Sequence, residues 1–190
     1  MRLQEVSRVH STLSLSKGKE RIQSIKKLHP QYVVGFIDGE GSFSVSIYKD
    51  ETMHSKINVR PEFEIELRAD DREILERIKE TLCCGIIYNC NYERYGWYPH
   101  AKYKISRINH LNERLIPFLE KHHLQAKKRK SFNQFKIIVQ MLVKKEHLTN
   151  RGIKKIIKLR DKIRALGKKH RLETARIREN RSSGGVSRHT

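Results

Sequence analysis

The sequence predicts an α+β domain in which helices cover one face of an antiparallel sheet, with extra helices towards the C-terminus. Three observations carry this prediction. The first is a short apolar helix that contains two glycines. The second is a set of segments in which apolar and polar residues alternate with the period of a strand. The third is the order of these segments: helix, two strands, helix, two strands and helix, followed by two more helices.

The first helix is predicted over residues 29–39. Pro30 suits its first turn, where a missing N–H costs nothing. Residues 32–37 are apolar on nearly every side, which is typical of a buried helix. Gly35 and Gly39 lie on one face, and a glycine inside a helix costs about 1 kcal/mol relative to alanine. The spacing therefore favours close approach of another helix to this face.

Alternation predicts four strands, over residues 42–49, 58–68, 86–92 and 101–108. The side chains expected on the core face of the first two are Phe43, Val45, Ile47, Val59, Phe63, Ile65 and Leu67. Gly85 opens the third strand, and residues 94–97 are expected to form a turn.

Helices are predicted between and after the strand pairs. Asp70 and Glu73 form a capping-box pattern that starts the second helix. Asn109 can cap the third helix, which Pro117 is expected to shorten or kink. Apolar residues at helical spacing predict the two extra helices, over residues 127–144 and after a Thr149 cap.

Length and charge limit the organisation and the partners. We expect a basic N-terminal arm over residues 1–27, one domain over 28–166 and a basic, flexible tail over 167–190. The formal net charge is +20, and residues 127–181 hold 20 Lys and Arg against four acidic residues. This charge favours nucleic acid over an anionic membrane surface, because Lys and Arg occupy all faces of residues 151–181. No apolar run approaches the roughly 20 residues of a membrane helix.

The cysteines are three in number, and two of them are adjacent: Cys83, Cys84 and Cys90. This is a poor disulfide framework and favours an intracellular reducing compartment, either a prokaryotic cytoplasm or an organelle such as a chloroplast or mitochondrion. Together with His100 the three cysteines would give four candidate zinc ligands. Adjacent cysteines do not match a C-x2-C spacing, so we favour the interpretation that the cysteines mark a buried strand start. The N-terminal arm lacks an apolar signal core, and its acidic residues leave a transit peptide without support.

The polar faces of the predicted strands carry side chains suited to DNA. A sheet or β-ribbon can enter the major groove, where base edges differ in their donors and acceptors. The candidate contacts are Ser42, Ser44, Ser46, Tyr48, Arg60, Glu66, Arg68, Tyr88, Lys102 and Lys104. The acidic residues Glu62, Glu64 and Glu66 would repel phosphate, but they can accept from cytosine amino groups or hold neighbouring arginines. The strand pattern alone favours a solvated face with cross-strand charge pairs.

Residues 33–41 read V-V-G-F-I-D-G-E-G and resemble the LAGLIDADG motif of homing endonucleases. The aligned positions are Gly35, Asp38, Glu40 and Gly41. A strand follows directly, as in the family, and the order of elements over about 28–166 matches its αββαββα core with a curved sheet. One copy of the motif is found, and single-copy members act as homodimers. The resemblance implies an intron-encoded or free-standing site-specific endonuclease that cuts both strands of a long pseudo-palindromic DNA site.

The resemblance also implies an active site. The family acid aligned with Glu40 binds a divalent metal, expected to be Mg²⁺, and the carbonyl aligned with Gly39 contributes. Asp38 is expected to be structural. A family lysine that stabilises charge or positions water aligns best with Lys127, with Lys128 as its rival and as a further DNA contact.

Two subunits are expected to share this centre. The expected dimer interface contains Tyr32, Gly35, Phe36 and Gly39. It would bring two copies of Glu40 close together, where the carboxylates repel and a divalent ion relieves the repulsion. Some family members carry a glutamine at the end of the second strand, near Ala69 here. Alanine cannot take the place of that glutamine in the water network of the site.

Two alternatives stay open. An intron RNA maturase, or another non-catalytic nucleic-acid-binding protein on the same scaffold, would keep its function in Glu40→Gln. A nuclease would lose cutting and retain DNA binding. A basic RNA-binding protein of ribosomal type would need neither a symmetric dimer nor a metal, and a solvated helix has no use for Gly35 and Gly39.

Overall fold

The structure, a computed structural model, describes residues 26–183 except 53–55, 93, 95 and 97, with side chains up to residue 167. The expected N-terminal arm therefore lies almost entirely outside the described residues. The helices and strands are α1 (Pro30–Glu40), β1 (Ser42–Lys49), β2 (Ile57–Arg68), α2 (Arg72–Leu82), β3 (Ile86–Cys90), β4 (His100–Ile105), α3 (Ile108–His110), α4 (Ile116–His122), α5 (Lys128–Val143) and α6 (Asn150–Ser183). This order confirms the predicted α+β fold.

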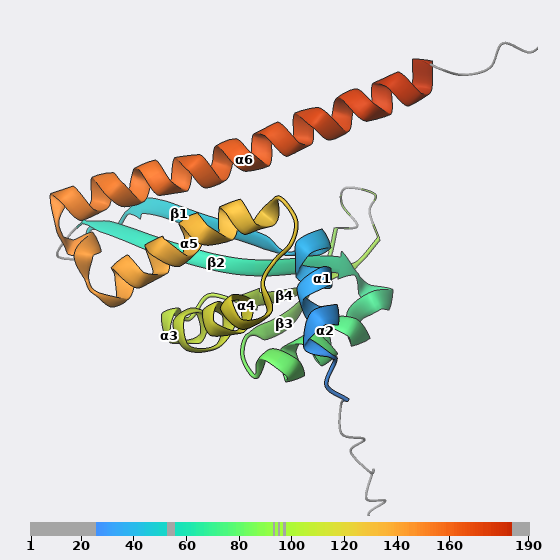
Figure 1. The fold of residues 1–190 in the computed structure, drawn as a ribbon, viewed down its shortest axis with the longest axis horizontal. Helices are drawn as coiled ribbons and strands as arrows, with labels where there is room; N and C mark the ends of the chain where they lie inside the picture. The colour runs from blue at the N-terminus through green and yellow to red at the C-terminus, as the bar shows by residue number, and fades with distance from the viewer. Residues whose placement is uncertain (1–25, 53–55, 93, 95, 97, 184–190) are drawn as a thin grey trace, which may run out of the picture.

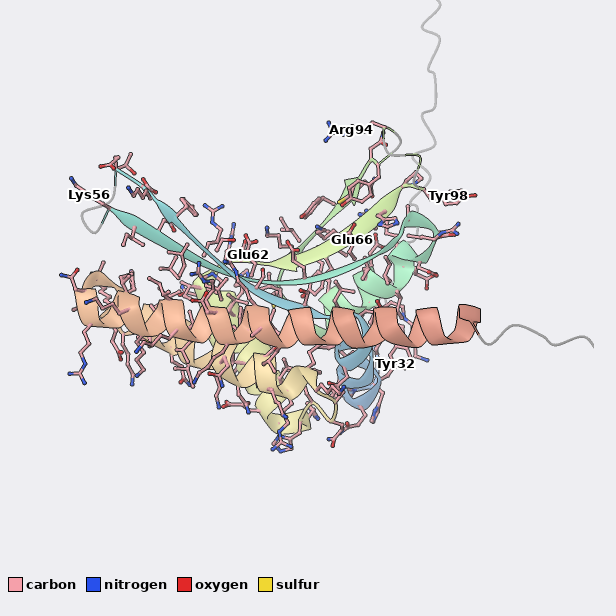
Figure 2. The ribbon with its side chains drawn as sticks, turned by 90° about the horizontal axis from the view of Figure 1, so that it is seen from above. Tyr32, Lys56, Glu62, Glu66, Arg94 and Tyr98 are labelled. Atoms are coloured by element: carbon pink, nitrogen blue, oxygen red, sulfur yellow. The ribbon has the colours of Figure 1, made fainter. Side chains whose placement is uncertain are left out.

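The four strands form one antiparallel sheet in the order β1-β2-β4-β3. The sheet is curved, with the helices packed against one face and its concave face turned away from them (Figures 1 and 2). Alternation places the apolar side chains on the helical face as predicted, and the buried ones include Phe43, Val45, Phe63, Ile65, Tyr103 and Ile105. The concave face is left with the polar side chains.

Aromatic contacts fix α5 to the sheet. The ring centroid of Phe43 on β1 lies 5.6 Å from that of Phe132 and 5.2 Å from that of Phe135, both on α5. Phe43 also lies 5.2 Å from Phe63 on β2. Such pairs add to the stabilisation that comes from burying apolar surface. The N-terminus of α5 is thereby held beside the junction of α1 and β1.

Two predicted caps are wrong. The N-cap residue of α2 is Asp71, and neither Asp70 nor Glu73 makes a described capping hydrogen bond. A 3₁₀ turn, Ala69–Asp71, precedes the helix, and Asp70 there pairs with Arg68 at 2.9 Å. Asn109 lies inside α3, whose N-cap residue is Arg107.

The fourth strand is shorter than predicted, since β4 ends at Ile105 and the chain turns into α3 at Ile108. The third helical segment continues through Pro117 because a π-helical turn, Leu111–Leu115, comes before it. Wider hydrogen bonding in this turn accommodates a residue that cannot donate.

Helix α6 starts as predicted: Thr149 Oγ1 accepts a hydrogen bond from the N–H of Gly152 at 3.0 Å, which is N-capping geometry. Its buried residues are Ile153, Ile156, Leu159 and Ile163. They pack α6 against α5 and the edge strand β1 (Figure 1). The helix runs without a break past residue 166 to Ser183, so the division into domain and tail remains a prediction. None of the described helices combines the length and hydropathy needed to cross a membrane.

Candidate active site

Glu40 is the last residue of α1 and lies two residues before β1, at the junction of the helix with the sheet. Gly41 makes this junction possible. A Cβ at Gly41 would lie 2.8 Å from the Ile37 carbonyl oxygen and 3.0 Å from the Phe63 ring. The exposed Glu40 carboxylate thus sits at the electronegative end of a helix, a position that favours a cation nearby.

Lys128, in the first turn of α5, reaches the same junction. Its Nζ donates a hydrogen bond to the carbonyl oxygen of Gly39 at 2.8 Å. Burial lowers the pKa of Lys128, and the charges of Glu40 and Asp38 oppose that shift. Lys128 is therefore the lysine that the structure brings to the acidic end of α1. Lys127 is the N-cap residue of α5, and its catalytic role remains a prediction.

Asp38 ties α1 to the turn before α5. Its Oδ2 accepts from the N–H groups of Gln125 at 2.6 Å and Ala126 at 3.2 Å. Its Oδ1 is buried and has no hydrogen-bond partner among the described residues. These bonds, across some 87 residues of sequence, set the distance from α5 to α1 and so the reach of Lys128.

One face of α1 is open. Val33, Val34 and Ile37 are buried, whereas Tyr32 is 51% exposed and Gly35 and Gly39 are also exposed. Among the described residues no atom lies within 4 Å of a Cβ added at either glycine. Phe36 is partly buried, with its ring stacked 6.2 Å from that of Tyr32. Although nearly all its sides are apolar, α1 is thus covered by described residues on one side only.

The concave face of the sheet carries an alternating row of charges, which we call the charge ladder. Its members are Glu62, Glu64 and Glu66 on β2 and His100, Lys102 and Lys104 on β4. Figure 2 shows Glu62 and Glu66 on this face, between Lys56 at one end and Tyr98 at the other.

Each lysine of the ladder bridges two carboxylates. Lys104 Nζ lies 2.8 Å from Glu62 Oε1 and 3.2 Å from Glu64 Oε1. Lys102 Nζ lies 3.7 Å from Glu64 Oε2 and 3.0 Å from Glu66 Oε2. His100 Nδ1 lies 3.0 Å from Glu66 Oε1. The glutamates thus hold lysines, not the neighbouring arginines that the sequence suggested.

These ion pairs change the charge that the two lysines present to a partner. Burial alone would lower the pKa of Lys102, but its hydrogen bond with Glu66 and the nearby carboxylates raise it above its usual value. The pKa of Lys104 is raised for the same reason by Glu62 and Glu64. Both lysines stay charged and are largely neutralised by their partners.

The arginines at the ends of the sheet are more accessible. Arg60 is exposed, with its guanidinium 5.6 Å from the centroid of the Tyr48 ring. Arg68 lies 4.5 Å from the Tyr98 ring and pairs with Asp70. The other predicted contacts on this face are exposed or partly exposed: Ser42, Ser44, Ser46, Tyr48 and Tyr88.

The described residues of this chain do not form a metal centre from side chains alone. In the described part of the chain, no three His, Cys, Asp or Glu residues gather as a metal site would require. The cysteines are free thiols. Cys84 is buried two residues before β3, whereas Cys83 is exposed at the end of α2, so the predicted buried strand start holds for Cys84 only. The donors that meet at the end of α1 are a carboxylate, Glu40, and a carbonyl, Gly39.

Sequence patterns identified this surface in part. The strand pattern favoured cross-strand charge pairs, and the ion pairs of Glu62, Glu64 and Glu66 with lysines of β4 confirm that interpretation. His100 entered only as a zinc candidate, yet it ends the charge ladder. The partners of the glutamates depend on the register of β2 with β4, in which Glu64 faces Lys104 and Glu66 faces Lys102.

Comparison with known proteins adds independent findings. The family model for "LAGLIDADG endonuclease" matches residues 33–139. The chain is 33% identical over 134 residues to probable intron-encoded endonuclease 2 of Neurospora crassa, covering 70% of this chain and 28% of that protein. It is 33% identical over 116 residues to homing endonuclease I-ApeII of Aeropyrum pernix, covering 61% and 65% of the two chains.

Solved structures of homing endonucleases are also similar to this chain. I-SmaMI bound to an uncleaved DNA target in the presence of calcium ions matches with a TM-score of 0.67 and 32% identity, over 72% of this chain and 45% of that one. The homing endonuclease I-TnaI matches with a TM-score of 0.65 and 28% identity, over 76% and 99% of the two chains. The chain thus spans less than a third of its Neurospora relative and nearly all of the I-TnaI chain.

Proposed function

Because this chain belongs to the LAGLIDADG endonuclease family, we propose that it is a homodimeric, site-specific DNA endonuclease that uses a divalent metal, expected to be Mg²⁺. One observation carries the proposal. Glu40 ends a helix whose face at Gly35 and Gly39 is open among the described residues, and it lies two residues before β1, a strand of the sheet with the polar concave face. A second copy and a DNA duplex would together complete the centre that one subunit leaves unfinished.

The open face of α1 supports a dimer. Small residues four apart let two helices approach closely, and no atom of the described part of the chain lies within 4 Å of a Cβ added at Gly35 or Gly39. Tyr32 and Phe36 extend the same apolar surface. The chain covers less than half of the I-SmaMI chain, so two copies would supply an equivalent pair of halves. A two-fold axis along α1 would bring the two Glu40 carboxylates together.

The residues at the end of α1 suit a hard divalent cation. Carboxylate and carbonyl oxygens are its preferred ligands, and Glu40 and Gly39 would supply one of each from every subunit. The ammonium of Lys128 already occupies a cation position 2.8 Å from the Gly39 carbonyl. When bound, the metal would offset charge on the scissile phosphate and lower the pKa of an attacking water.

The chain's own groups would carry the remaining tasks. Glu40 would hold the metal at the electronegative end of α1. Lys128 would stabilise charge that develops on the phosphate, at a distance set by the Asp38 bonds to Gln125 and Ala126. The concave sheet face would enter the major groove and position the duplex, with Arg60 and Arg68 at the flanks.

A cleavage assay tests the proposal. The substrate is DNA spanning the insertion site of the gene, incubated with Mg²⁺ and with EDTA. We expect double-strand cleavage with Mg²⁺ only, leaving 3′ overhangs with 5′-phosphate ends. Absence of products with Mg²⁺, or equal products in EDTA, would contradict the proposal.

Two variants separate the nuclease from a non-catalytic binder. Glu40→Gln should abolish cutting and retain binding of the same duplex in a gel-shift assay. Glu120→Gln is the control, because Glu120 pairs with Lys136 on the helical side of the sheet and loses the same charge. A Glu40→Gln protein that still cuts DNA would refute the assignment of the metal-binding acid.

A further inference from the structure

The charge ladder is unusual in a protein of net charge +20, because it places three carboxylates at the centre of the surface proposed to face DNA. With His100 neutral, three glutamates and two lysines give it a net charge of −1; with His100 protonated it is neutral. The two lysines that would otherwise attract phosphate are each held by two carboxylates.

The ladder is also partly shielded from solvent. Its side chains are only between 15% and 31% exposed, against 53% for Arg68 at the end of the sheet. Glu64 stands at its centre and uses Oε1 for Lys104 and Oε2 for Lys102. Loss of the Glu64 charge would therefore take one of its two carboxylate partners from each lysine at once, leaving Lys104 with Glu62 and Lys102 with Glu66.

Binding of DNA irrespective of sequence comes mainly from the release of counterions when Lys and Arg neutralise phosphates. A lysine already neutralised by two carboxylates contributes little to that term. Carboxylates also discriminate among bases, since they accept from the amino groups of cytosine and adenine and oppose the acceptor edges of guanine and thymine. A wrong base pair leaves a carboxylate desolvated and without a donor, which is costly.

We propose that the charge ladder determines specificity: Glu62, Glu64 and Glu66 neutralise Lys102 and Lys104 in the free protein, and so suppress binding to DNA of unrelated sequence. The lysines and glutamates turn from one another to base edges only where the duplex offers the matching donors and acceptors. The inference rests on the proposed DNA-binding function and adds the origin of its selectivity.

The test measures binding to a random-sequence duplex of about 30 base pairs by fluorescence anisotropy, from low to moderate salt. Each phosphate contact contributes a slope of about −0.9 to log K against log salt concentration. Glu64→Gln should tighten this binding and steepen the slope by up to about 0.9, because the ladder loses one negative charge and each lysine keeps only one carboxylate partner. Thermal unfolding of the variant checks that it is folded.

The matched control is Glu120→Gln, which adds the same charge and opens the Glu120–Lys136 ion pair on the opposite side of the sheet. It should change the slope by no more than about 0.3, a third of what one phosphate contact contributes. Equal slopes in Glu64→Gln and Glu120→Gln would overturn the inference, since net charge alone would then explain the effect.

A second pair of variants gives an independent readout. Lys104→Gln should leave the slope of the random-sequence duplex nearly unchanged, because Lys104 is neutralised in the free protein. Arg60→Gln should reduce the slope by about 0.9, because Arg60 is exposed. Equal losses from both would also overturn the inference. Cleavage retained with either overturning result would leave the endonuclease proposal standing, whereas no DNA binding by the wild-type protein would overturn both.

Discussion

Replacing Gly35 with alanine separates two reasons for a glycine in the middle of α1. No described atom lies within 4 Å of the position that a Cβ would take, so the isolated subunit has room for a methyl group. Alanine stabilises a helix interior by about 1 kcal/mol relative to glycine. If α1 faced only solvent, Gly35→Ala would raise the free energy of unfolding by that amount.

In a dimer packed through α1 the same methyl group appears twice, on both sides of the two-fold axis. Overpacking a close contact costs about 1–3 kcal/mol. A value of about 2 kcal/mol would raise the dissociation constant about thirtyfold. We expect the dimer to weaken although each subunit becomes intrinsically more stable.

Gly167 supplies the control. It lies inside α6, is exposed, and likewise has no described atom within 4 Å of an added Cβ. Gly167→Ala should therefore show the stabilisation without any change in association. Sedimentation velocity over a range of protein concentrations measures the dissociation constant, and urea unfolding measures stability. If Gly35→Ala sediments like the wild-type protein and gains the full stabilisation, the glycine-lined interface is wrong.

Three further predictions concern the site and the scaffold. Lys128→Met should lower the cleavage rate constant at least about a hundredfold with DNA binding retained, because it removes the hydrogen bond of Lys128 to Gly39. Lys127→Met should lower the rate constant far less, and the reverse order would restore Lys127 as the catalytic lysine. Thr149→Ala should lower the free energy of unfolding by about 1 kcal/mol through loss of the α6 cap, whereas Thr149→Ser should retain it; urea titration distinguishes them. Gly41→Ala should destabilise by about 1–3 kcal/mol, since its Cβ would clash with Ile37 and Phe63, and an unchanged melting temperature would contradict the tight junction of α1 with β1.

The fold was predictable because its signals are local. Alternation marked β1 with its observed bounds, and Pro30 and Thr149 marked the starts of α1 and α6. The wrong capping predictions also came from local patterns. They failed because another local interaction competes with the expected cap. Asp70 had a suitable spacing for a cap, yet it lies in a 3₁₀ turn that directs its carboxylate to Arg68.

The candidate site was predictable to the level of the motif. Gly35, Asp38, Glu40 and Gly41 follow from residues adjacent in sequence. The choice between Lys127 and Lys128 could not be predicted in this way. Successive side chains on a helix point about 100° apart, so the orientation of α5 against α1 decides which lysine reaches Gly39.

The partners within the charge ladder are set by strand register, which sequence alone fixes poorly. Alternation predicted that Lys102 and Lys104 share a face with the glutamates. It could not predict that each lysine bridges its direct partner and the diagonal neighbour two residues away. This pairing matters for DNA affinity, because an unpaired lysine can neutralise a phosphate whereas a lysine held by carboxylates contributes little.

The uncovered side of α1 has a consequence for gene dosage. In the proposed dimer each chain brings one Glu40 to a centre that needs two, so a single chain would not cut DNA. At chain concentrations well below the dissociation constant, the amount of dimer would grow with the square of the amount synthesised. A fall in expression would then lower the amount of active enzyme more than proportionally.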